Sequence, residues 1–441
     1  MSLKHRHISR RSLLTSGALA GVLAATGVPL QAQPKRGGTL RLGLESDGIR
    51  NWDARRSFDP LMRVAAQGCV FDCLTEVTAQ GQLVGELAES WEGSADAKVW
   101  TFTLRSGVTF HNGRPFGADD VVETFLFYQS DKDGAAIPFA CQMADIQKLG
   151  DRKVRITLEE PNADFPFLLA DPQMMIYPAR QMGEAITRGI GTGLYRVANK
   201  DDGILRLERV VGHYKDGKAG WFDAVELHPI SDSNARMTAL LTDQVDAVGD
   251  VPFDAIPYLQ GRDDIDLAVA RGTRHMVLDP EEMGAPREVL RQEIDREGIV
   301  SELLHGYGSV AQDHPIGPGN TYYTEIEVPA SQGPKLLLKD LSRVSFRDGR
   351  MTEDWMFSTL KHPDTPRFKA LLKEARATTD SKRRAQIYAE MQKITAEEGV
   401  EVIPAFADYV DAYRKTLAHP ETLGALAALD SSRIAERWWF A

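Results

Sequence analysis

Residue types that often do chemistry are present in this chain, but their spacing does not assemble an active site. The sequence lacks a nucleophile elbow, a zinc-protease motif, a phosphate-binding loop and a dinucleotide fingerprint. His111 precedes an Asn-Gly pair, which favours a tight turn, so we interpret it as a turn residue rather than a base. The acid pairs Asp119-Asp120 and Glu281-Glu282 are sequence neighbours, whose side chains diverge on a helix. We therefore expect a binding protein with no catalytic residue and no cofactor.

The chain has three cysteines, which limits the disulfides and metal sites that it can form. Residues 61–74 have the pattern of a helix, on which Cys69 and Cys73 would share one face. We expect both thiols to be buried and to pack as small hydrophobic groups. A metal pair would need further ligands nearby, and the ten histidines are scattered along the chain. The sequence therefore predicts no metal site.

The first 32 residues have the pattern of an export signal. Arg10 and Arg11 precede a mildly apolar stretch at 13–30, and Ala32 offers a small residue at a cleavage position. Paired arginines here favour the twin-arginine export route. The stretch is short and interrupted by glycine and threonine, which argues against a membrane span, although an uncleaved anchor is the alternative. We expect a periplasmic protein whose signal is cleaved near Ala32.

Composition and charge narrow the class of partner. The chain has 441 residues, of which 43% are hydrophobic and 26% charged, and its formal net charge is -11. This length allows two or three domains. No basic stripe is present that could neutralise phosphates, so a nucleic-acid partner is not expected. The acidic balance mildly favours cationic ligands.

The hydrophobic pattern predicts mixed α and β structure in two styles. Before about residue 210, alternating stretches such as 38–44 and 99–105 predict strands and hairpins. After about residue 224, strand and helix signals alternate along the chain. Thr365 and Asp380 are expected to cap two helices near the C-terminus. The expected fold class is α/β, with the aromatic end of the chain packed on a core.

Several motifs together resemble family 5 extracellular solute-binding proteins, which are the oligopeptide, dipeptide and nickel receptors of ABC importers. The matching segments are Gly37 to Leu40, Leu87 to Trp91, Trp100 to Gly113, Ala118 to Val121, Gly191 to Tyr195, Ile294 to Val300, and Gly349 to Ser358. Leu194 stands where the family element Gly-Thr-Gly-Pro-Tyr has proline. The resemblance runs from about Gly37 to Ala441.

The resemblance implies a two-lobed periplasmic-binding-protein fold, of type II and cluster C-like, with an extra N-terminal subdomain. It implies a signal at 1–32, an N-terminal lobe at 33–228 plus 412–441 with a subdomain inserted at about 58–180, and a C-terminal lobe at 229–411. Closure of the lobes would trap a solute. The implied partners are a peptide or similar small solute and the ABC permease subunits at the membrane, with a monomeric receptor as the default.

The chain departs from the family pattern in the second lobe. The run before Ile294 is compressed, the segment between Tyr323 and Arg350 is short, and Ser358 is followed almost at once by 361–363. We therefore expect a shortened second lobe. One alternative is a truncated, non-transporting relative that has lost solute binding and acts as a partner-binding or chaperone-like protein. Another is an exported hydrolase, which would need a nucleophile and base pair.

Ligand contacts are expected from loops at strand ends that face the cleft. In the first lobe these would be Glu45, Ser46 and Asp47, with Asp47 either pairing with a ligand amine or remaining a solvated turn acid. In the second lobe they would be Trp355, Met356, Phe357 and Ser358, where an aromatic ring offers stacking area. The alternative for Trp355 and Phe357 is an ordinary place in the core. The sequence does not name the solute, because one scaffold of this kind serves many ligands.

Overall fold

We describe the fold from a computed structural model of the chain. The structure describes residues 34–327 except 57 and 202, residues 338, 341, 344–348, 352–359 and 361, and residues 365–441. The predicted signal with Arg10, Arg11 and Ala32 lies outside these residues, as do 349–351 and 362–363 of the motif comparison. Residues 35–441 form one compact unit. Within the described part of the chain, no helix has the length and hydropathy that crossing a bilayer requires.

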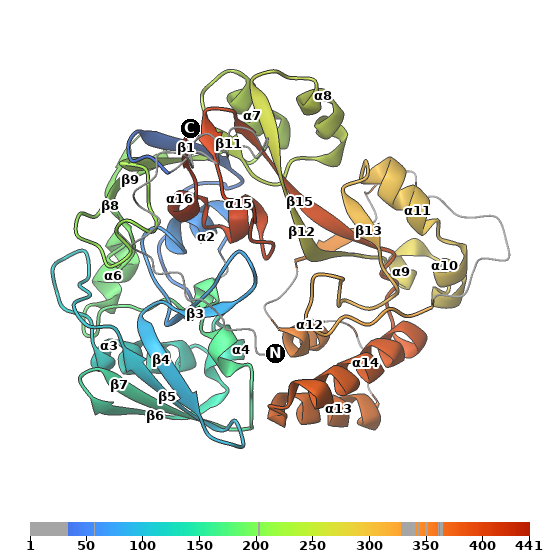
Figure 1. The fold of residues 1–441 in the computed structure, drawn as a ribbon, viewed down its shortest axis with the longest axis horizontal. Coiled ribbons are helices and arrows are strands. Elements are labelled where there is room, and N and C mark those ends of the chain that lie inside the picture. Colours follow the sequence, from blue (N-terminus) through green and yellow to red (C-terminus); the bar gives the residue numbers. More distant parts are fainter. Residues whose placement is uncertain are drawn as a thin grey trace, which may run out of the picture. The chain divides into compact units, whose positions relative to one another are not determined.

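A nine-stranded mixed sheet forms the centre of the fold (Figure 1). Its path runs β14-β12-β15-β11-β1-β10-β9-β8, and β13 pairs with β15. Leu40, Leu42 and Leu44 of β1 are buried, because β1 lies between two parallel neighbours, β10 and β11. The strands are β1 (Thr39–Leu44), β8 (Tyr195–Asp201), β9 (Ile204–Arg209), β10 (Ala224–Pro229), β11 (Ala247–Val248), β12 (Ile265–Val277), β13 (Gly308–Val310), β14 (Ser345–Arg347) and β15 (Ala405–Arg414).

The long strands β12 and β15 run side by side and join two hydrophobic cores (Figure 1). Ala268 of β12 and Tyr413 of β15 belong to the core around β1. Met276 of β12 and Val410 of β15 belong to a second core, which includes residues of α7 (Ser233–Leu241), α8 (Ile256–Gln260) and α10 (Arg287–Glu293). The β12–β15 register shifts between Ala270 and Arg274, which marks a bulge in the paired strands.

A four-stranded antiparallel sheet forms a separate layer in the order β4-β5-β7-β6. Trp100, Phe102 and Leu104 of β5 are buried on one face, as their alternation predicts. Helix α3 packs on this sheet, and the Asp120 carboxylate at its start accepts the Gly117 N–H at 2.8 Å. The elements are β4 (Ala88–Gly93), β5 (Val99–Leu104), α3 (Ala118–Gln129), β6 (Met143–Gly150) and β7 (Lys153–Leu158).

Three helices near the C-terminus build a further core from α12 (Glu353–Thr359), α13 (Pro366–Ala377) and α14 (Ser381–Glu398). The predicted caps are confirmed. The Thr365 hydroxyl accepts the Phe368 N–H at 3.2 Å, and the Asp380 carboxylate accepts the Arg383 N–H at 2.8 Å. These caps fix where α13 and α14 begin.

The helix predicted over 61–74 is wrong in its length. Helix α2 ends at Ala66, because Gly68 takes a left-handed backbone with φ of 82° that ends the helix. Cys69 and Cys73 follow it and are buried, as expected for packing thiols. Trp438 and Trp439 at the chain end are buried, as predicted. The expected α/β class is confirmed by the mixed sheets and their helices.

The remaining elements connect these layers. They are α2 (Pro60–Ala66), β2 (Thr75–Val77), β3 (Leu83–Gly85), α4 (Ile137–Ala140), α5 (Phe165–Leu168), α6 (Met182–Arg188), α7 (Ser233–Leu241), α8 (Ile256–Gln260), α9 (Pro280–Met283), α10 (Arg287–Glu293), α11 (Arg296–Gly298), β16 (Leu417–Ala418), α15 (Ala428–Ser431), α16 (Ile434–Arg437) and β17 (Trp439–Phe440).

Candidate functional site

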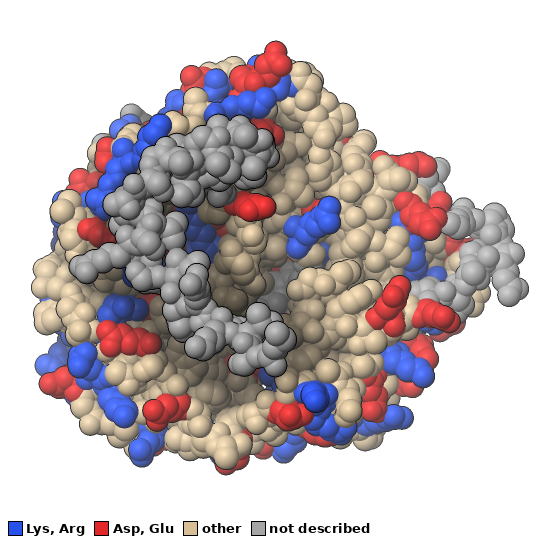
Figure 2. All heavy atoms as spheres, viewed as in Figure 1, with Lys and Arg blue, Asp and Glu red and all other residues tan. Residues whose placement is uncertain are grey.

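A cavity of about 700 Å³ is the candidate solute site. Figure 2 shows a hollow on this face of the molecule, in the region where Figure 1 places β3, α12 and α15. The wall combines segments that are distant in sequence: the β2–β3 turn at 78–81, Asp164 and Phe167, 269–272 of β12, 319–322, Thr352 and Glu353, Arg384, and the C-terminal loop at 421–426 with Ser431.

Glu353 is a buried carboxylate without a cationic partner on this wall. Its side chain is 7% exposed, and it forms no ion pair within the part of the chain that the structure describes. One oxygen accepts the Tyr322 N–H at a long 3.4 Å. Loss of water around the carboxylate raises the pKa of Glu353 to about 7. The neighbouring Asp354, by contrast, is paired with Arg376 at 2.9 Å.

The guanidinium of Arg384 and the carboxylate of Asp164 form a bidentate pair in the same wall. Nη1 of Arg384 donates to Asp164 Oδ1 at 2.8 Å, and Nη2 donates to Oδ2 and to the Tyr388 hydroxyl. Although burial opposes its charge, the contact with Asp164 raises the pKa of Arg384. The Arg384 guanidinium lies over the rings of Tyr322 and Tyr388, which adds a cation–π contact.

Arg271 brings a second guanidinium to the cavity from the bulged stretch of β12. Its side chain is exposed and forms no ion pair among the described residues. Burial raises the pKa of nearby Asp408 to about 6, although the positive charge of Arg271 opposes the rise. The wall therefore offers one free cationic group and one free buried anionic group.

The first three predicted contact residues lie away from this cavity. The hydroxyl of Ser46 is buried and lies 2.8 Å from Asp59 Oδ2, so it fixes the local loop. Asp47 accepts the Ser231 hydroxyl at 2.7 Å. Glu45 lines a smaller cavity of about 130 Å³ and lies 3.8 Å from Arg236. Of the three residues, Glu45 is the one that lines either of these two cavities.

The four predicted residues of the second group lie on α12, just beyond the main cavity. Met356 and Phe357 are fully buried in the core of α12 to α14. Trp355 stacks on Phe139, with ring centroids 4.5 Å apart and planes 3° from parallel. Trp355 and Ser358 border a third pocket, on the side of α12 away from Glu353.

Sequence reasoning missed the residues that do line the main cavity. Glu353 stands within the family motif segment from Gly349 to Ser358, one helical turn before the buried Met356 and Phe357. The sequence did offer one signal for Glu353: it is a carboxylate at a helix start, next to residues that face the core. Arg271 and Arg384 carried no signal in the sequence, because arginines on strand and helix surfaces are common.

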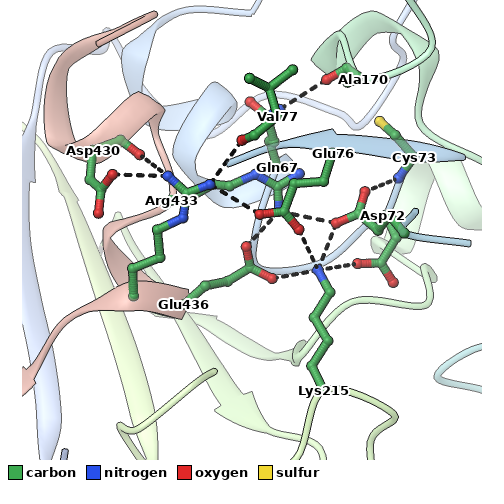
Figure 3. A network of polar contacts seen from close by, with 12 residues as sticks. Gln67, Asp72, Cys73, Glu76, Val77, Ala170, Lys215, Asp430, Arg433 and Glu436 are labelled. Atoms are coloured by element: carbon green, nitrogen blue, oxygen red, sulfur yellow. Dashed lines mark hydrogen bonds and ion pairs between the residues drawn. The ribbon is translucent and has the colours of Figure 1, made fainter. Parts of the chain in front are cut away.

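Three other acids form the one group of described residues whose spacing suits a metal ion: Asp72, Glu86 and Glu436. Figure 3 shows the Lys215 ammonium beside Asp72 and Glu436. Lys215 Nζ lies 3.2 Å from Asp72, 2.6 Å from Glu86 and 2.7 Å from Glu436. The ammonium therefore holds the position that a metal ion would need.

The rest of this network ties the C-terminus to the first core. Arg433 contacts Glu86 at 3.0 Å, and Arg437 contacts Glu76 at 3.0 Å. Burial raises the pKa of Glu86 to about 7, against the opposing effect of Arg433 and Lys215. The network is a buried structural clamp between the strand β2 region and α16.

No nucleophile and base pair assembles in the main cavity. Among the described residues that line it there is no histidine, cysteine or lysine. His111 lies elsewhere, and the prediction that it caps its own turn is wrong: its Nε2 lies 3.0 Å from the Gly193 carbonyl, and its Nδ1 accepts the Gly191 N–H at 3.3 Å, so its ring contacts backbone that is distant in sequence. The cavity chemistry therefore suits binding through hydrogen bonds and charge.

Comparisons with known proteins agree with this geometry. Residues 82–411 match the sequence model of bacterial extracellular solute-binding proteins, family 5 Middle. The glutathione-binding protein GsiB of Pectobacterium atrosepticum is 26% identical over 361 residues, covering 79% of this chain and 68% of the relative. A probable peptide ABC transporter periplasmic-binding protein, y4tO of Sinorhizobium fredii, is 28% identical, covering 71% of this chain and 63% of the relative. The match thus spans about two thirds of the length of these curated relatives.

A solved structure shares the fold. The periplasmic binding protein AgaA from A. tumefaciens R10, in complex with agropinic acid, superposes with a TM-score of 0.77 at 20% identity, covering 92% of this chain and 99% of AgaA. The chain therefore has the two-lobed α/β fold of periplasmic binding proteins. Its relatives are solute-binding proteins rather than enzymes. Because the family match spans more than half of its length, this chain belongs to the family 5 bacterial extracellular solute-binding proteins of ABC importers.

Proposed function

We propose that this protein is the periplasmic receptor of an ABC importer, and that it captures a small solute with a cationic group in the 700 Å³ cavity. A peptide amine is the simplest such group. The receptor then delivers the solute to the permease subunits. The observation that carries the proposal is Glu353, a buried cavity carboxylate that forms no ion pair with another described residue.

An unpaired buried carboxylate is costly for a protein to keep. Removing an ionised carboxylate from water costs several kcal/mol unless a partner compensates it. A solute ammonium would supply that partner and would draw the raised pKa of Glu353 back down. Arg271 is suited to a carboxylate of the same solute, since it is exposed on the cavity wall and forms no ion pair with another described residue.

The cavity volume supports a solute of peptide size. A volume of about 700 Å³ lies within the usual range of small-molecule sites. Glu45 stays a proposed contact for a longer solute, because the smaller cavity that it lines borders the same C-terminal loop. Ser46 and Asp47 are proposed to fix the loop that follows β1, through their contacts with Asp59 and Ser231. We propose that Trp355, Met356, Phe357 and Ser358 act indirectly, through the packing that holds their helix α12 in place.

The predicted organisation of the chain belongs to the same proposal. Separate cores around β1 and around α7 to α10 support lobes at 33–228 plus 412–441 and at 229–411. The subdomain at about 58–180 contains the four-stranded sheet. The shortened second lobe, the monomeric state, twin-arginine export and cleavage near Ala32 stay predictions from the sequence.

The test uses protein recovered from the periplasm and a panel of short peptides and glutathione. Each peptide is paired with its N-acetylated form, which lacks the ammonium. Ligand at about 100 times its Kd would stabilise the fold by about 2.7 kcal/mol, and so raise the Tm. We expect free-amine solutes to raise the Tm and acetylated partners to fail.

The matched variants are Glu353→Gln and Glu421→Gln. Both residues line the cavity, but Glu421 is exposed. We expect Glu353→Gln to weaken binding at least tenfold and Glu421→Gln to leave it nearly unchanged. Equal binding of acetylated and free peptides would refute the assigned role of Glu353. A panel without any Tm shift would refute the receptor function in this solute class.

A further inference from the structure

The wall beside the main cavity contains an unusual turn of left-handed backbone. Leu429, Asp430, Ser431 and Ser432 have φ angles of 57°, 58°, 56° and 64°, and none of them is glycine. Each such residue is strained, because its Cβ crowds the backbone. A run of this kind persists only where surrounding contacts fix it.

The Asp411 carboxylate supplies the first of those contacts. Its Oδ2 accepts the Leu429 N–H at 2.6 Å, and its Oδ1 accepts the Asp250 N–H at 3.1 Å. Asp411 lies on β15, is 2% exposed, and forms no ion pair within the described residues. One carboxylate thus bridges the end of β11 to the start of the turn.

Further contacts hold the rest of the turn. The Asp430 carboxylate accepts the Gly424 N–H at 2.7 Å and Arg437 Nη1 at 2.9 Å. Gly249, after β11, leaves room for Leu429, since a Cβ there would lie 2.9 Å from Leu429 Cγ. The turn is therefore fitted to the β11–β15 pair.

The position of the turn links it to solute binding. Ser431 lines the main cavity, whereas Leu429 and Ser432 line the smaller one. The strand that carries Asp411 runs between the two cores beside β12 (Figure 1). A shift of the turn would move the walls of both cavities together.

We propose that Asp411 is a positioning residue for solute binding, whose ionised carboxylate holds the left-handed turn and the cavity wall in place against strands β11 and β15. This inference rests on the proposed receptor function. Asp411 lines neither of the two cavities, so its effect on a solute is transmitted by the turn.

The hydrogen bonds by which Asp411 holds the turn should depend on whether its carboxylate is protonated. Burial raises the pKa of Asp411 to about 7, against the opposing hydrogen bonds from the Asp250 and Leu429 amides. The charged groups that face it are Asp250, which pairs with Arg274 at 2.6 Å, and Asp430, which pairs with Arg437 at 2.9 Å. A protonated Asp411 accepts one amide well and the other poorly.

Nuclear magnetic resonance of the labelled backbone amides tests, without any solute, whether Asp411 holds the left-handed turn. We expect the Leu429 and Asp250 amide signals to titrate together, with one midpoint near pH 7. Asp411→Asn should abolish that shared titration. Amides that do not titrate, or that keep the same titration in Asp411→Asn, would overturn the assignment. The amide signals also separate Asp411 from Glu353, which titrates in the same range.

Solute affinity tests the positioning role. We expect Asp411→Asn to weaken binding about tenfold, because an amide group can accept from only one of the two N–H groups. Adding Ser432→Gly should recover about threefold, since glycine takes the left-handed conformation without strain. Adding Ser432→Ala is the matched control: it removes the same hydroxyl, keeps the Cβ, and should recover nothing.

The outcomes separate this inference from the receptor function. Unchanged affinity in Asp411→Asn, or equal effects of glycine and alanine at 432, would overturn the positioning role. A wild type that binds no solute would overturn the receptor function and the binding half of this inference. The amide titration would then still decide whether Asp411 holds the turn.

Discussion

Asp164 and Arg384 form a buried bidentate ion pair in the cavity wall although 220 residues separate them in sequence. Asp164 stands just before α5, beside the four-stranded sheet, and Arg384 stands in the first turn of α14. The pair joins two layers that share no strand. It therefore fixes how the C-terminal helices meet the rest of the cavity wall.

Removing one member of this pair should lower the free energy of unfolding substantially. In Arg384→Met the Asp164 carboxylate stays buried without its cation, so we expect the free energy of unfolding to fall by about 3 to 5 kcal/mol. Urea unfolding at pH 7.5 measures the loss. The double variant Asp164→Asn with Arg384→Met should recover much of it, since no buried charge is left. A single-variant loss of under about 0.5 kcal/mol would mean that solvent reaches the pair.

Glu353 predicts how stability depends on pH. Its folded pKa of about 7 exceeds the unfolded value of about 4.3, so between these values the folded state holds a proton that the unfolded state releases. The contribution of Glu353 to stability therefore falls as pH rises through this window. Glu353→Gln removes the titration, so its stability relative to wild type should rise by about 1 to 3 kcal/mol between pH 5 and pH 8.

Urea unfolding at the two pH values measures this change. Glu421→Gln serves as the control on the exposed rim of the same cavity, and we expect the same difference from wild type at both pH values. A Glu353→Gln variant whose difference from wild type is equal at pH 5 and pH 8 would contradict the buried position of Glu353.

Lys215 should contribute far more to the free energy of unfolding than its exposed neighbour Lys218. Lys215→Ala leaves Asp72, Glu86 and Glu436 together without the ammonium between them, and we expect a loss of about 3 to 5 kcal/mol. Lys218→Ala should cost under about 0.5 kcal/mol. Thermal unfolding with millimolar Mg²⁺ or Ca²⁺ completes the test. A wild-type Tm that rises with either ion, beyond a matched ionic-strength control, would show that the metal displaces Lys215.

The three cysteines should differ sharply in reactivity. Cys141 is exposed, whereas Cys69 and Cys73 are buried, and burial raises the pKa of both thiols. Native protein should therefore take up one maleimide per chain, and Cys141→Ser should take up none. Mass spectrometry after a short incubation counts the labels. Two or three labels on native wild type would show that the core around Cys69 opens.

Local sequence patterns predicted the local structure well. The alternation of Trp100, Phe102 and Leu104 gave a strand with one buried face, and the capping residues Thr365 and Asp380 gave the starts of two helices. These features follow from backbone geometry and nearest-neighbour hydrogen bonds, which a short segment contains in full. The exception at 61–74 arose from one local residue, Gly68, whose left-handed backbone ends α2.

Such local patterns could not predict the candidate site. Trp355 and Phe357 attracted attention as aromatic residues, yet the free cavity carboxylate belongs to Glu353, which precedes them on the same helix. Which face of α12 meets the cavity depends on how α13 and α14 pack against it, and no segment alone carries that information.

The sequence by itself determined the α/β class, the family, and the absence of the enzyme motifs that it was searched for, because repeating patterns and motif spacings are properties of the chain. Only the tertiary structure decided the partners of the buried charges. Lys215 meets three carboxylates from distant segments, Arg384 meets Asp164, and Glu353 forms no ion pair with any other described residue. The physical reason is that the cost of a charge depends on what surrounds it after folding, and those surroundings come from parts of the chain hundreds of residues apart.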